Sequence, residues 1–150
     1  MGSADAQGIP ASGRLLPSAE GISLALSAAR AGMWEWDIHS NENRWSDEVW
    51  PLYGLDQRQH SPCYNHWLLS VHEDDREQAS VLIATAVAQR RPFEIEWRTH
   101  PDLGPVRWRL SRGQPGVCQE DQVQTYVGIV MDISQRKAAE QSLQTLNDAL

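Results

Sequence analysis

The sequence of 150 residues is poor in cysteine and contains no long apolar run. Its two cysteines, Cys63 and Cys118, form neither a metal-binding nor a redox spacing, so a disulfide framework is not indicated. No apolar stretch approaches the roughly 18 residues that a membrane span requires, and Met1 is not followed by a signal-peptide pattern. We therefore expect a cytoplasmic protein with no membrane segment.

Basic residues are also scarce. The chain has 13 Lys and Arg against 20 Asp and Glu, which gives a net charge of -7. A negative surface repels phosphates, so nucleic acid is not an expected partner. The motifs of phosphate-binding loops, zinc hydrolases and nucleophile elbows are absent as well, and no catalytic or metal-binding residues are predicted. With 41% apolar residues, the length suits one domain with one core.

The strongest pattern lies near the carboxyl end, where a strand-like alternation changes into a helical one. Residues 122–133 predict a strand whose buried face carries Val123, Thr125, Val127, Ile129, Met131 and Ile133. Ser134 is placed to cap the helix that follows. In residues 135–150 the apolar positions are Ala139, Leu143, Leu146 and Leu150. Successive apolar positions are four, three and four residues apart, which is typical of a dimeric coiled coil. Because this pattern is still running at its last residue, we expect the helix to continue into another domain.

The amino-terminal part divides into two segments. Residues 1–17 hold Gly, Ser, Ala and two Pro without periodicity, which indicates a flexible lead-in. Residues 18–31 bring Ile22, Leu26 and Ala29 to one face at helical spacing, which predicts a short amphipathic helix. We expect this helix to lie across a sheet or to pair with its copy in a dimer.

The next part of the chain begins with a hairpin. Residues 33–38 alternate between apolar and acidic side chains, and the turn-forming residues 39–43 lead to a second short strand at Trp45. Two or three short helices are expected in residues 47–72. A long helix follows, because apolar residues recur at helical spacing on one face: Ala79, Leu82, Ile83, Ala86 and Val87.

Two more alternating segments predict strands. The residues that we expect to face the core are Phe93, Ile95 and Trp97, then Val106, Trp108 and Leu110. The resulting order of elements is typical of an antiparallel α+β domain with its helices on one side of the sheet.

Several local motifs occur in order within about residues 30–136. They are Trp34-Glu35-Trp36-Asp37, Leu52-Tyr53-Gly54-Leu55, Val71-His72-Glu73-Asp74-Asp75, Val106-Arg107-Trp108 and Asp132-Ile133-Ser134. Their order and spacing resemble the Per-Arnt-Sim (PAS) sensory domain, in particular the bacterial subgroup with a Trp-x-Trp-Asp first strand and a carboxyl-terminal PAC-type motif. Glu73 stands where this family usually has Pro, and Ser134 stands where it usually has Thr. Both residues still suit the start of a helix.

The resemblance implies a PAS fold over residues 32–134, in which a five-stranded antiparallel sheet carries short helices and one long helix on one face. It also implies a pocket for a small ligand or cofactor and a relay through Asp132, Ile133 and Ser134 into the carboxyl-terminal helix. In such chains the output domain is typically a histidine kinase, a diguanylate cyclase or a phosphodiesterase. We therefore expect a homodimeric module, itself no enzyme, with an output domain in the same chain.

The expected pocket is rich in tryptophan, which allows two interpretations. Its candidate residues are Trp34, Trp36, Trp45, Trp50, Tyr53, Trp67, Leu82, Val87, Trp97, Ile129 and Met131. Indoles could stack on a flavin or another flat ring, or they could simply fill a small core. We favour the filled core, and the sequence does not name a cofactor.

Haem and zinc are both disfavoured. In haem-binding relatives the proximal His tends to lie within the long helix, and residues 76–90 contain none, so His72 is expected to be a capping or surface residue. Cys63, His66 and His72 have no standard zinc spacing and no fourth ligand. The reactive-cysteine motif of the light-sensing flavin subgroup, Asn-Cys-Arg-Phe-Leu, is absent.

Two hypotheses of function follow. The first is a sensory and dimerisation module of a bacterial signalling protein that holds a small ligand and relays its state to the carboxyl-terminal helix. The second is a ligand-free interaction domain that only pairs two chains through residues 18–31 and 135–150. An enzyme would require a constellation of polar groups inside the cavity, which the sequence does not indicate.

Overall fold

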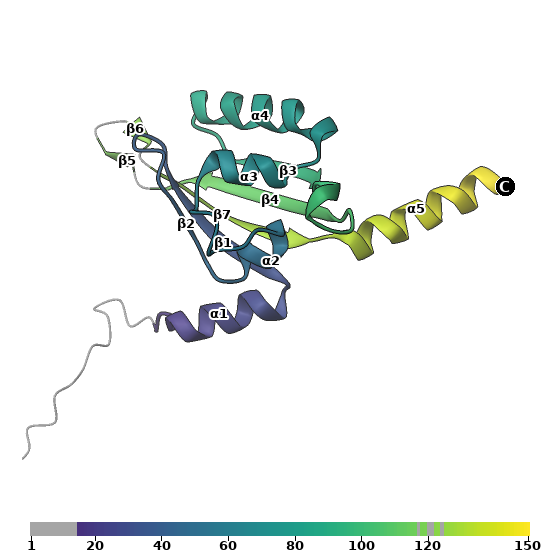
Figure 1. The fold of residues 1–150 in the computed structure, drawn as a ribbon, viewed down its shortest axis with the longest axis horizontal. Coiled ribbons are helices and arrows are strands. Elements are labelled where there is room, and N and C mark those ends of the chain that lie inside the picture. The colour runs from purple at the N-terminus through teal and green to yellow at the C-terminus, as the bar shows by residue number, and fades with distance from the viewer. Residues whose placement is uncertain (1–14, 117, 120–121, 124) are drawn as a thin grey trace, which may run out of the picture.

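Five antiparallel strands form one sheet in the order β2-β1-β7-β4-β3 (Figure 1). The computed structural model describes residues 15–116, 118–119, 122–123 and 125–150. The strands of the sheet are β1 (Ala31–Asp37), β2 (Asn43–Trp45), β3 (Phe93–Arg98), β4 (Trp108–Pro115) and β7 (Thr125–Asp132). A two-stranded extension, β5 (Cys118–Gln119) and β6 (Gln122–Val123), joins β4 to β7. The predicted five-stranded α+β fold is confirmed.

The helices lie in three places around this sheet (Figure 1). Their bounds are α1 (Ala19–Ala28), α2 (Val49–Tyr53), α3 (Tyr64–Ser70), α4 (Glu73–Ala88), the 3-10 helix η1 (Pro101–Leu103) and α5 (Ser134–Ala149). Helices α2, α3 and α4 pack on one face, α1 lies next to β1, and α5 projects away from the sheet. Within the described ranges, no helix combines the length and apolar character needed to cross a bilayer.

One core lies between the sheet and α2, α3 and α4. Trp97, Tyr126 and Val130 contribute fully buried side chains from the sheet. Helix α4 faces them with Ala79, Ile83 and Ala86, which belong to the predicted apolar face. Burying a large apolar side chain contributes about 1.5–3 kcal/mol, so this layer holds the helices on the sheet.

The central strand β7 buries a different face from the one that its alternation predicts. Val127, Ile129 and Met131 are only half-buried, whereas Tyr126 and Val130 are fully buried in the core. The prediction was wrong because apolar residues occupy both faces of β7, so the alternation does not select one of them. The face that is buried is the one on which the large rings of β1 pack. The predicted burial of Val123 concerns a side chain outside the described residues.

The same error affects β4. Val106 precedes the strand and is 47% exposed, and Trp108 is half-buried. Leu110 is buried, but it lies opposite Met131 on the face away from the core. The core face of β4 instead presents Arg109 and Ser111, two polar residues that an alternation of apolar side chains does not indicate.

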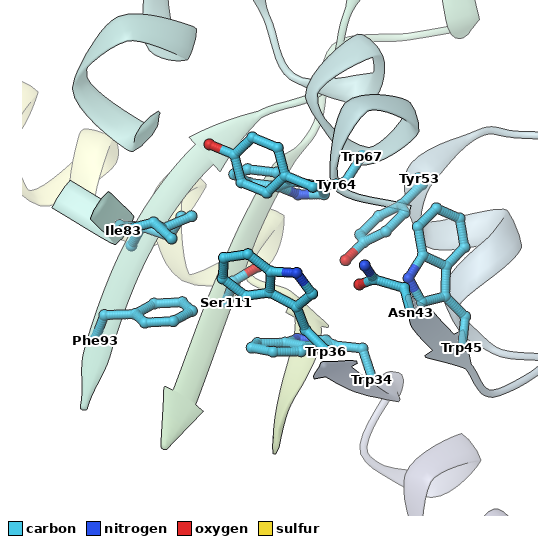
Figure 2. A pocket seen from close by; sticks show the side chains of 11 residues that line it. Trp34, Trp36, Asn43, Trp45, Tyr53, Tyr64, Trp67, Ile83, Phe93 and Ser111 are labelled. Atoms are coloured by element: carbon cyan, nitrogen blue, oxygen red, sulfur yellow. The ribbon is translucent and has the colours of Figure 1, made fainter. Parts of the chain in front are cut away.

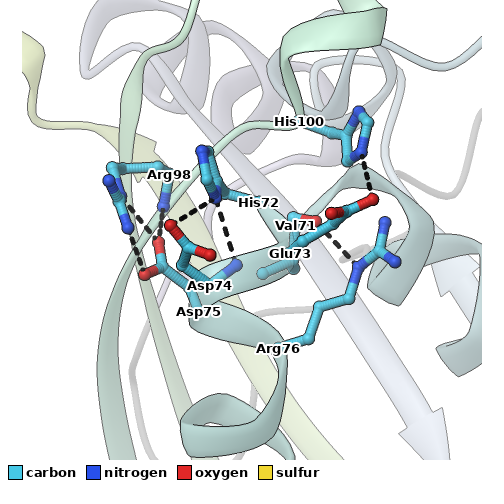
Figure 3. A network of polar contacts seen from close by, with 8 residues as sticks. All are labelled: Val71, His72, Glu73, Asp74, Asp75, Arg76, Arg98 and His100. Atoms are coloured by element: carbon cyan, nitrogen blue, oxygen red, sulfur yellow. Dashed lines mark hydrogen bonds and ion pairs between the residues drawn. The ribbon is translucent and has the colours of Figure 1, made fainter.

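The start of α4 is fixed by polar contacts with β3 (Figure 3). The Asp75 carboxylate accepts hydrogen bonds from the Arg98 backbone N–H at 2.9 Å and from the guanidinium Nε and Nη2 atoms at 3.1 and 2.8 Å. Burial alone would raise the pKa of Asp75, but the hydrogen bonds and charge of Arg98 outweigh it and lower this pKa. His72 caps the helix, because its Nδ1 atom accepts a hydrogen bond from the Asp74 N–H at 3.1 Å.

We expect His72→Ala to lower the free energy of unfolding by about 1 kcal/mol, because the Asp74 N–H loses its acceptor. His72→Asn is the matched control, since an Asn side chain supplies a capping oxygen at the same position, and it should remain close to the wild type. Urea unfolding at neutral pH measures both. An Ala variant as stable as the wild type would show that the imidazole cap contributes nothing.

Candidate functional site

A small cavity lies between the core face of the sheet and helices α2, α3 and α4 (Figure 2). Its volume is about 40 Å³. The residues that line it are Trp34, Trp36, Asn43, Trp45, Tyr53, Tyr64, Trp67, Ile83, Phe93, Ile95 and Ser111. Nearly all of this lining is aromatic or aliphatic, and none of it carries a charge.

Two glycines lie in the sheet beneath the cavity, where no side chain covers the backbone. Gly113 and Gly128 lie directly opposite each other on β4 and β7. A Cβ atom on Gly113 would lie 2.6 Å from Phe93 and 2.7 Å from Trp34, and one on Gly128 would collide with Trp34 and the Arg112 carbonyl oxygen. The Trp34 indole can therefore lie against the sheet, where it stacks on Phe93 with ring centroids 5.8 Å apart.

The aromatic rings of the lining contact one another. Trp36 stacks on Tyr64 at the half-buried mouth, with a centroid distance of 5.6 Å. Deeper in, Tyr53 contacts Trp97 at 5.6 Å and meets the Trp45 ring edge-on at 5.0 Å. Ring pairs of this kind stabilise a core beyond their buried area. The cavity is thus the space left over by a closely packed aromatic layer.

Polar groups in the lining are few. The Ser111 hydroxyl oxygen accepts a hydrogen bond from the Trp97 Nε1 atom at 2.9 Å. Tyr53 is almost fully buried, and burial raises the pKa of its hydroxyl, so it stays protonated. Asn43 adds an amide group from the edge strand β2, next to the Tyr53 hydroxyl (Figure 2).

This space does not fit a flavin or a haem. Pockets for drug-sized ligands have volumes of roughly 300–1,000 Å³, far above the 40 Å³ of this cavity. In the part of the chain that the structure describes, no group of three or more His, Cys, Asp or Glu side chains is arranged to hold a metal ion.

The predicted pocket residues divide into three groups. Those that line the cavity are Trp34, Trp36, Trp45, Tyr53 and Trp67. Those that pack in the surrounding core without lining it are Trp50, Leu82, Val87 and Trp97. Ile129 and Met131 lie on the opposite face of β7 from the core residue Val130, because adjacent residues of a strand alternate, so they were wrongly included.

Six lining residues were missed as pocket candidates: Asn43, Tyr64, Ile83, Phe93, Ile95 and Ser111. Three of them belong to apolar faces that the sequence does predict, so the positions of Ile83, Phe93 and Ile95 could have been included. Ser111 and Asn43 are polar, and only the strand register places them beside the indoles.

A second site lies where β7 passes into α5. Asp132 accepts a hydrogen bond from the Ser134 N–H at 2.8 Å and lies 3.1 Å from the Arg109 guanidinium Nη1 atom. The Arg109 Nε atom also donates to the Leu52 carbonyl oxygen of α2 at 2.8 Å. One buried guanidinium therefore contacts both α2 and the last residue of β7.

Ser134 does not cap α5, contrary to the prediction. It is the first helical residue, and its hydroxyl oxygen accepts a hydrogen bond from the Trp108 N–H at 3.0 Å. The Asp132 carboxylate supplies the acceptor for the first turn instead. Ile133 between them is buried, and its N–H donates to the Trp108 carbonyl oxygen at 3.1 Å, so this junction is tied to β4.

The first turn of α5 is also joined to β3. Glu96 forms ion pairs with Arg136 and Lys137. The hydrogen bond from Lys137, against the opposing effect of burial, lowers the pKa of Glu96. The Lys137 ammonium lies 4.6 Å from the centre of the Trp108 ring, a cation–π distance. The beginning of α5 is therefore held by β3, β4 and β7 together.

Charge burial at this junction is substantial. The Arg109 side chain is 7% exposed. Its burial lowers its pKa, while the charge of Asp132 acts in the opposite direction. Burial alone would raise the pKa of Asp132, but hydrogen bonds from Ser134 and the charge of Arg109 outweigh it, and the pKa is lowered. Removing one partner of such a pair leaves the other charge desolvated, which is costly.

An antiparallel five-stranded sheet with a small cavity under its helices and a projecting terminal helix defines an α+β domain of the PAS type. The family model of the PAS fold matches residues 42–130. The chain belongs to the PAS fold family.

Two curated relatives have long chains. The probable diguanylate cyclase DgcE of Escherichia coli is 28% identical over 124 residues, which cover 83% of this chain and 11% of that protein. The uncharacterized protein y4lL of Sinorhizobium fredii is 35% identical over 75 residues, or 50% of this chain and 9% of that protein. This chain thus spans about a tenth of the length of the curated relatives that it matches.

Solved structures show the same fold. A sensory box histidine kinase/response regulator from Burkholderia thailandensis superposes with a TM-score of 0.68 at 26% identity, covering 85% of this chain and 95% of that one. The amino-terminal domain of a diguanylate cyclase with a PAS/PAC sensor from Marinobacter aquaeolei gives a TM-score of 0.65 at 17% identity, covering 71% and 98%. PAS sensor domains of this kind therefore occur in histidine kinases and diguanylate cyclases.

We expect the stability of the junction to depend on acid. The pKa of Asp132 is lower in the folded state than its ordinary value of 3.8, so its stabilising contribution is complete above about pH 4 and is lost as the pH falls through the folded pKa. Asp132→Asn should therefore cost about 2 kcal/mol at pH 7 and progressively less toward pH 2. Urea unfolding across this range measures the difference.

Asp148→Asn serves as the control, because Asp148 is an exposed residue near the end of α5 and takes no part in the junction. Its unfolding curve should follow that of the wild type at every pH. A constant difference between the wild type and the Asp132 variant from pH 7 to pH 2 would contradict the ionic role of this carboxylate.

Proposed function

We propose that this chain is the sensory and dimerisation module of a bacterial signal-transduction protein, and that it relays the state of its cavity to an output domain through α5. The observation that carries this proposal is the position of Arg109, which contacts the Leu52 carbonyl oxygen and the Asp132 carboxylate at once. Membership of the PAS family supports the sensory role.

The proposed relay follows bonded neighbours. Tyr53 lines the cavity, and Leu52 directly precedes it on α2. A ligand that moves this short helix displaces the Leu52 carbonyl oxygen, which accepts the hydrogen bond of Arg109. The Arg109 guanidinium then shifts, and its contact with the Asp132 carboxylate changes. Because Asp132 accepts the hydrogen bond of the first helical turn, α5 is biased between two positions.

The output domain is proposed from the relatives. One relative is named a probable diguanylate cyclase and another a sensory box histidine kinase/response regulator. We propose an output domain of this kind, a histidine kinase or an enzyme that makes or degrades cyclic di-GMP, in the same chain as the PAS module. The module itself contributes regulation and no catalysis.

Exposed apolar side chains support a dimer. On α5, Leu143 and Leu146 are 65% and 60% exposed, in a stripe that begins at Ala139 and ends at Leu150. By helical spacing this stripe lies on the other side of α5 from Gln141 and Gln144, which face the groove beside Trp108. We propose that the stripe pairs with the same stripe of a second chain.

Helix α1 provides a second contact in this proposal. None of its side chains is buried; Ile22 is 42% exposed, Ala29 is exposed, and only Leu26 is half-buried. An apolar helix face without cover on a folded domain marks an interaction surface. We propose that residues 18–31 pair with their copy, and that residues 32–134 and 135–150 form the sensor and the start of the coiled coil.

A ligand-free dimerisation domain is the second candidate function. The observation that favours it is the volume of the cavity, about 40 Å³, which leaves little room among the rings. In that case residues 18–31 and 135–150 perform the whole function, and the aromatic layer only stabilises the fold.

We expect Arg109→Met and Asp132→Asn to change the activity of the output domain in the full-length protein several-fold and in the same direction. The double variant should show no further change, because both substitutions break one coupled pair. Glu94→Gln is the control, since it breaks an exposed ion pair with Arg112 that includes no residue of α5. Assays of output activity test this, with circular dichroism to verify folding. Additive effects of the two substitutions, or no effect of either, would contradict the proposed relay.

We expect Leu143→Glu and Leu146→Glu each to weaken dimerisation by about 10- to 100-fold, because each removes a buried leucine from the proposed interface. Gln141→Glu and Gln144→Glu add the same charge on the opposite side of α5 and should leave the dimer intact. Sedimentation equilibrium of the four variants measures the association constants. Equal effects on both sides of the helix would mean that α5 does not pair through this stripe.

A further inference from the structure

The Tyr53 hydroxyl group borders the open space of the cavity. Tyr53 is 3% exposed as a residue, and its hydroxyl makes no hydrogen bond to another residue in the described ranges. It points into the cavity beside the side chain of Asn43 (Figure 2). A hydroxyl that faces a cavity can donate to a molecule inside it, so this position favours a molecule that accepts a hydrogen bond.

Two further polar groups face the same space. Ser111 accepts a hydrogen bond from Trp97, while its own hydroxyl proton has no acceptor among the residues that the structure describes. Asn43 carries an amide at the mouth, and its nitrogen has one contact, 3.5 Å from the Asn41 carbonyl oxygen, at the limit of a hydrogen bond. The cavity therefore offers two hydroxyl donors and an amide that both donates and accepts.

Size and charge restrict what can bind there. A water molecule requires roughly 10–15 Å³ of such a volume, so 40 Å³ accommodates about three or four heavy atoms. No charged side chain occurs among the described residues that line the cavity. An ion placed between these rings would lose its hydration without a counter-charge, so the occupant is uncharged.

We infer that the cavity is the binding site of a small uncharged amide of three or four heavy atoms. The carbonyl oxygen of the amide accepts a hydrogen bond from the Tyr53 hydroxyl, and its remaining groups pair with Asn43, whose amide is complementary to another amide. The carbon end lies against the indole of Trp34. This inference rests on the proposed sensory function, because it names the chemical class of the input.

The test compares acetamide with acetate, which has the same shape and number of heavy atoms but carries a charge. The chain is labelled with nitrogen-15 in its tryptophan side chains, and the indole N–H signals are followed by NMR during each titration. Acetamide should shift the signals of Trp34, Trp45 and Trp67 in a saturable way. Acetate and the much larger benzamide should leave them unchanged.

Tyr53→Phe removes the hydroxyl at nearly constant volume and should weaken acetamide binding about 3- to 10-fold, the loss expected for one neutral hydrogen bond. Tyr64→Phe is the matched control, because the Tyr64 hydroxyl points away from Asn43 and Tyr53 (Figure 2). It should bind acetamide as the wild type does. Thermal melting verifies that both variants fold.

Saturable binding of acetamide alone, weakened only by Tyr53→Phe, supports the inference. No shift with acetamide, which leaves water as the occupant, overturns it, and so do equal shifts with acetate or an unchanged affinity in the Tyr53 variant. These outcomes are separate from those of the relay. Binding without coupled effects of Arg109 and Asp132 overturns the proposed function alone, whereas coupled effects without binding overturn this inference alone.

Discussion

The packing of large aromatic rings against a bare strip of sheet is the constraint on which this structure depends. Two opposed glycines let the Trp34 indole lie flat on β4 and β7, and the rings of Phe93 and Tyr126 continue that layer. Helices α2, α3 and α4 then pack on rings rather than on the backbone of the sheet. The cavity is consequently small, and its shape is set by ring contacts rather than by the length of any loop.

A second constraint acts at the edge of this layer, where a charge is buried. Arg109 occupies the core face of β4 and is satisfied by the Leu52 carbonyl oxygen and Asp132. Because a desolvated guanidinium requires its partners, Arg109 joins helix α2 to Asp132, the last residue of β7. The aromatic layer and the charged junction thus meet at adjacent residues, Leu52 and Tyr53.

Much of this architecture follows from periodicity. The order of strands and helices and the inward face of α4, with Ala79 and Ile83, were predicted, because their apolar residues recur at a single clear spacing. The inward face of β7 was not predicted correctly. Val127 and Val130 lie on opposite faces and both are apolar, so only the packing of the aromatic rings determines which face is buried.

The polar part of the site was harder to predict for a different reason. The bond between Arg109 and Leu52 joins residues that are 57 positions apart, and no local pattern indicates it. Ser134 illustrates the same limit at short range. Its type suits a helix cap, but Asp132 accepts the hydrogen bond of the first turn, and the serine hydroxyl accepts from β4 instead.

Helix α5 gains a mechanical property from the way it is held. It is fixed at its first turn by contacts with three strands, and its 16 residues give it a length of about 24 Å. It therefore acts as a lever with its fulcrum at Ser134. A tilt of about 5° at the fulcrum, smaller than the scatter of helix packing angles, moves the far end by about 2 Å. Rearrangements too small to alter the fold of the domain are thus amplified along its length.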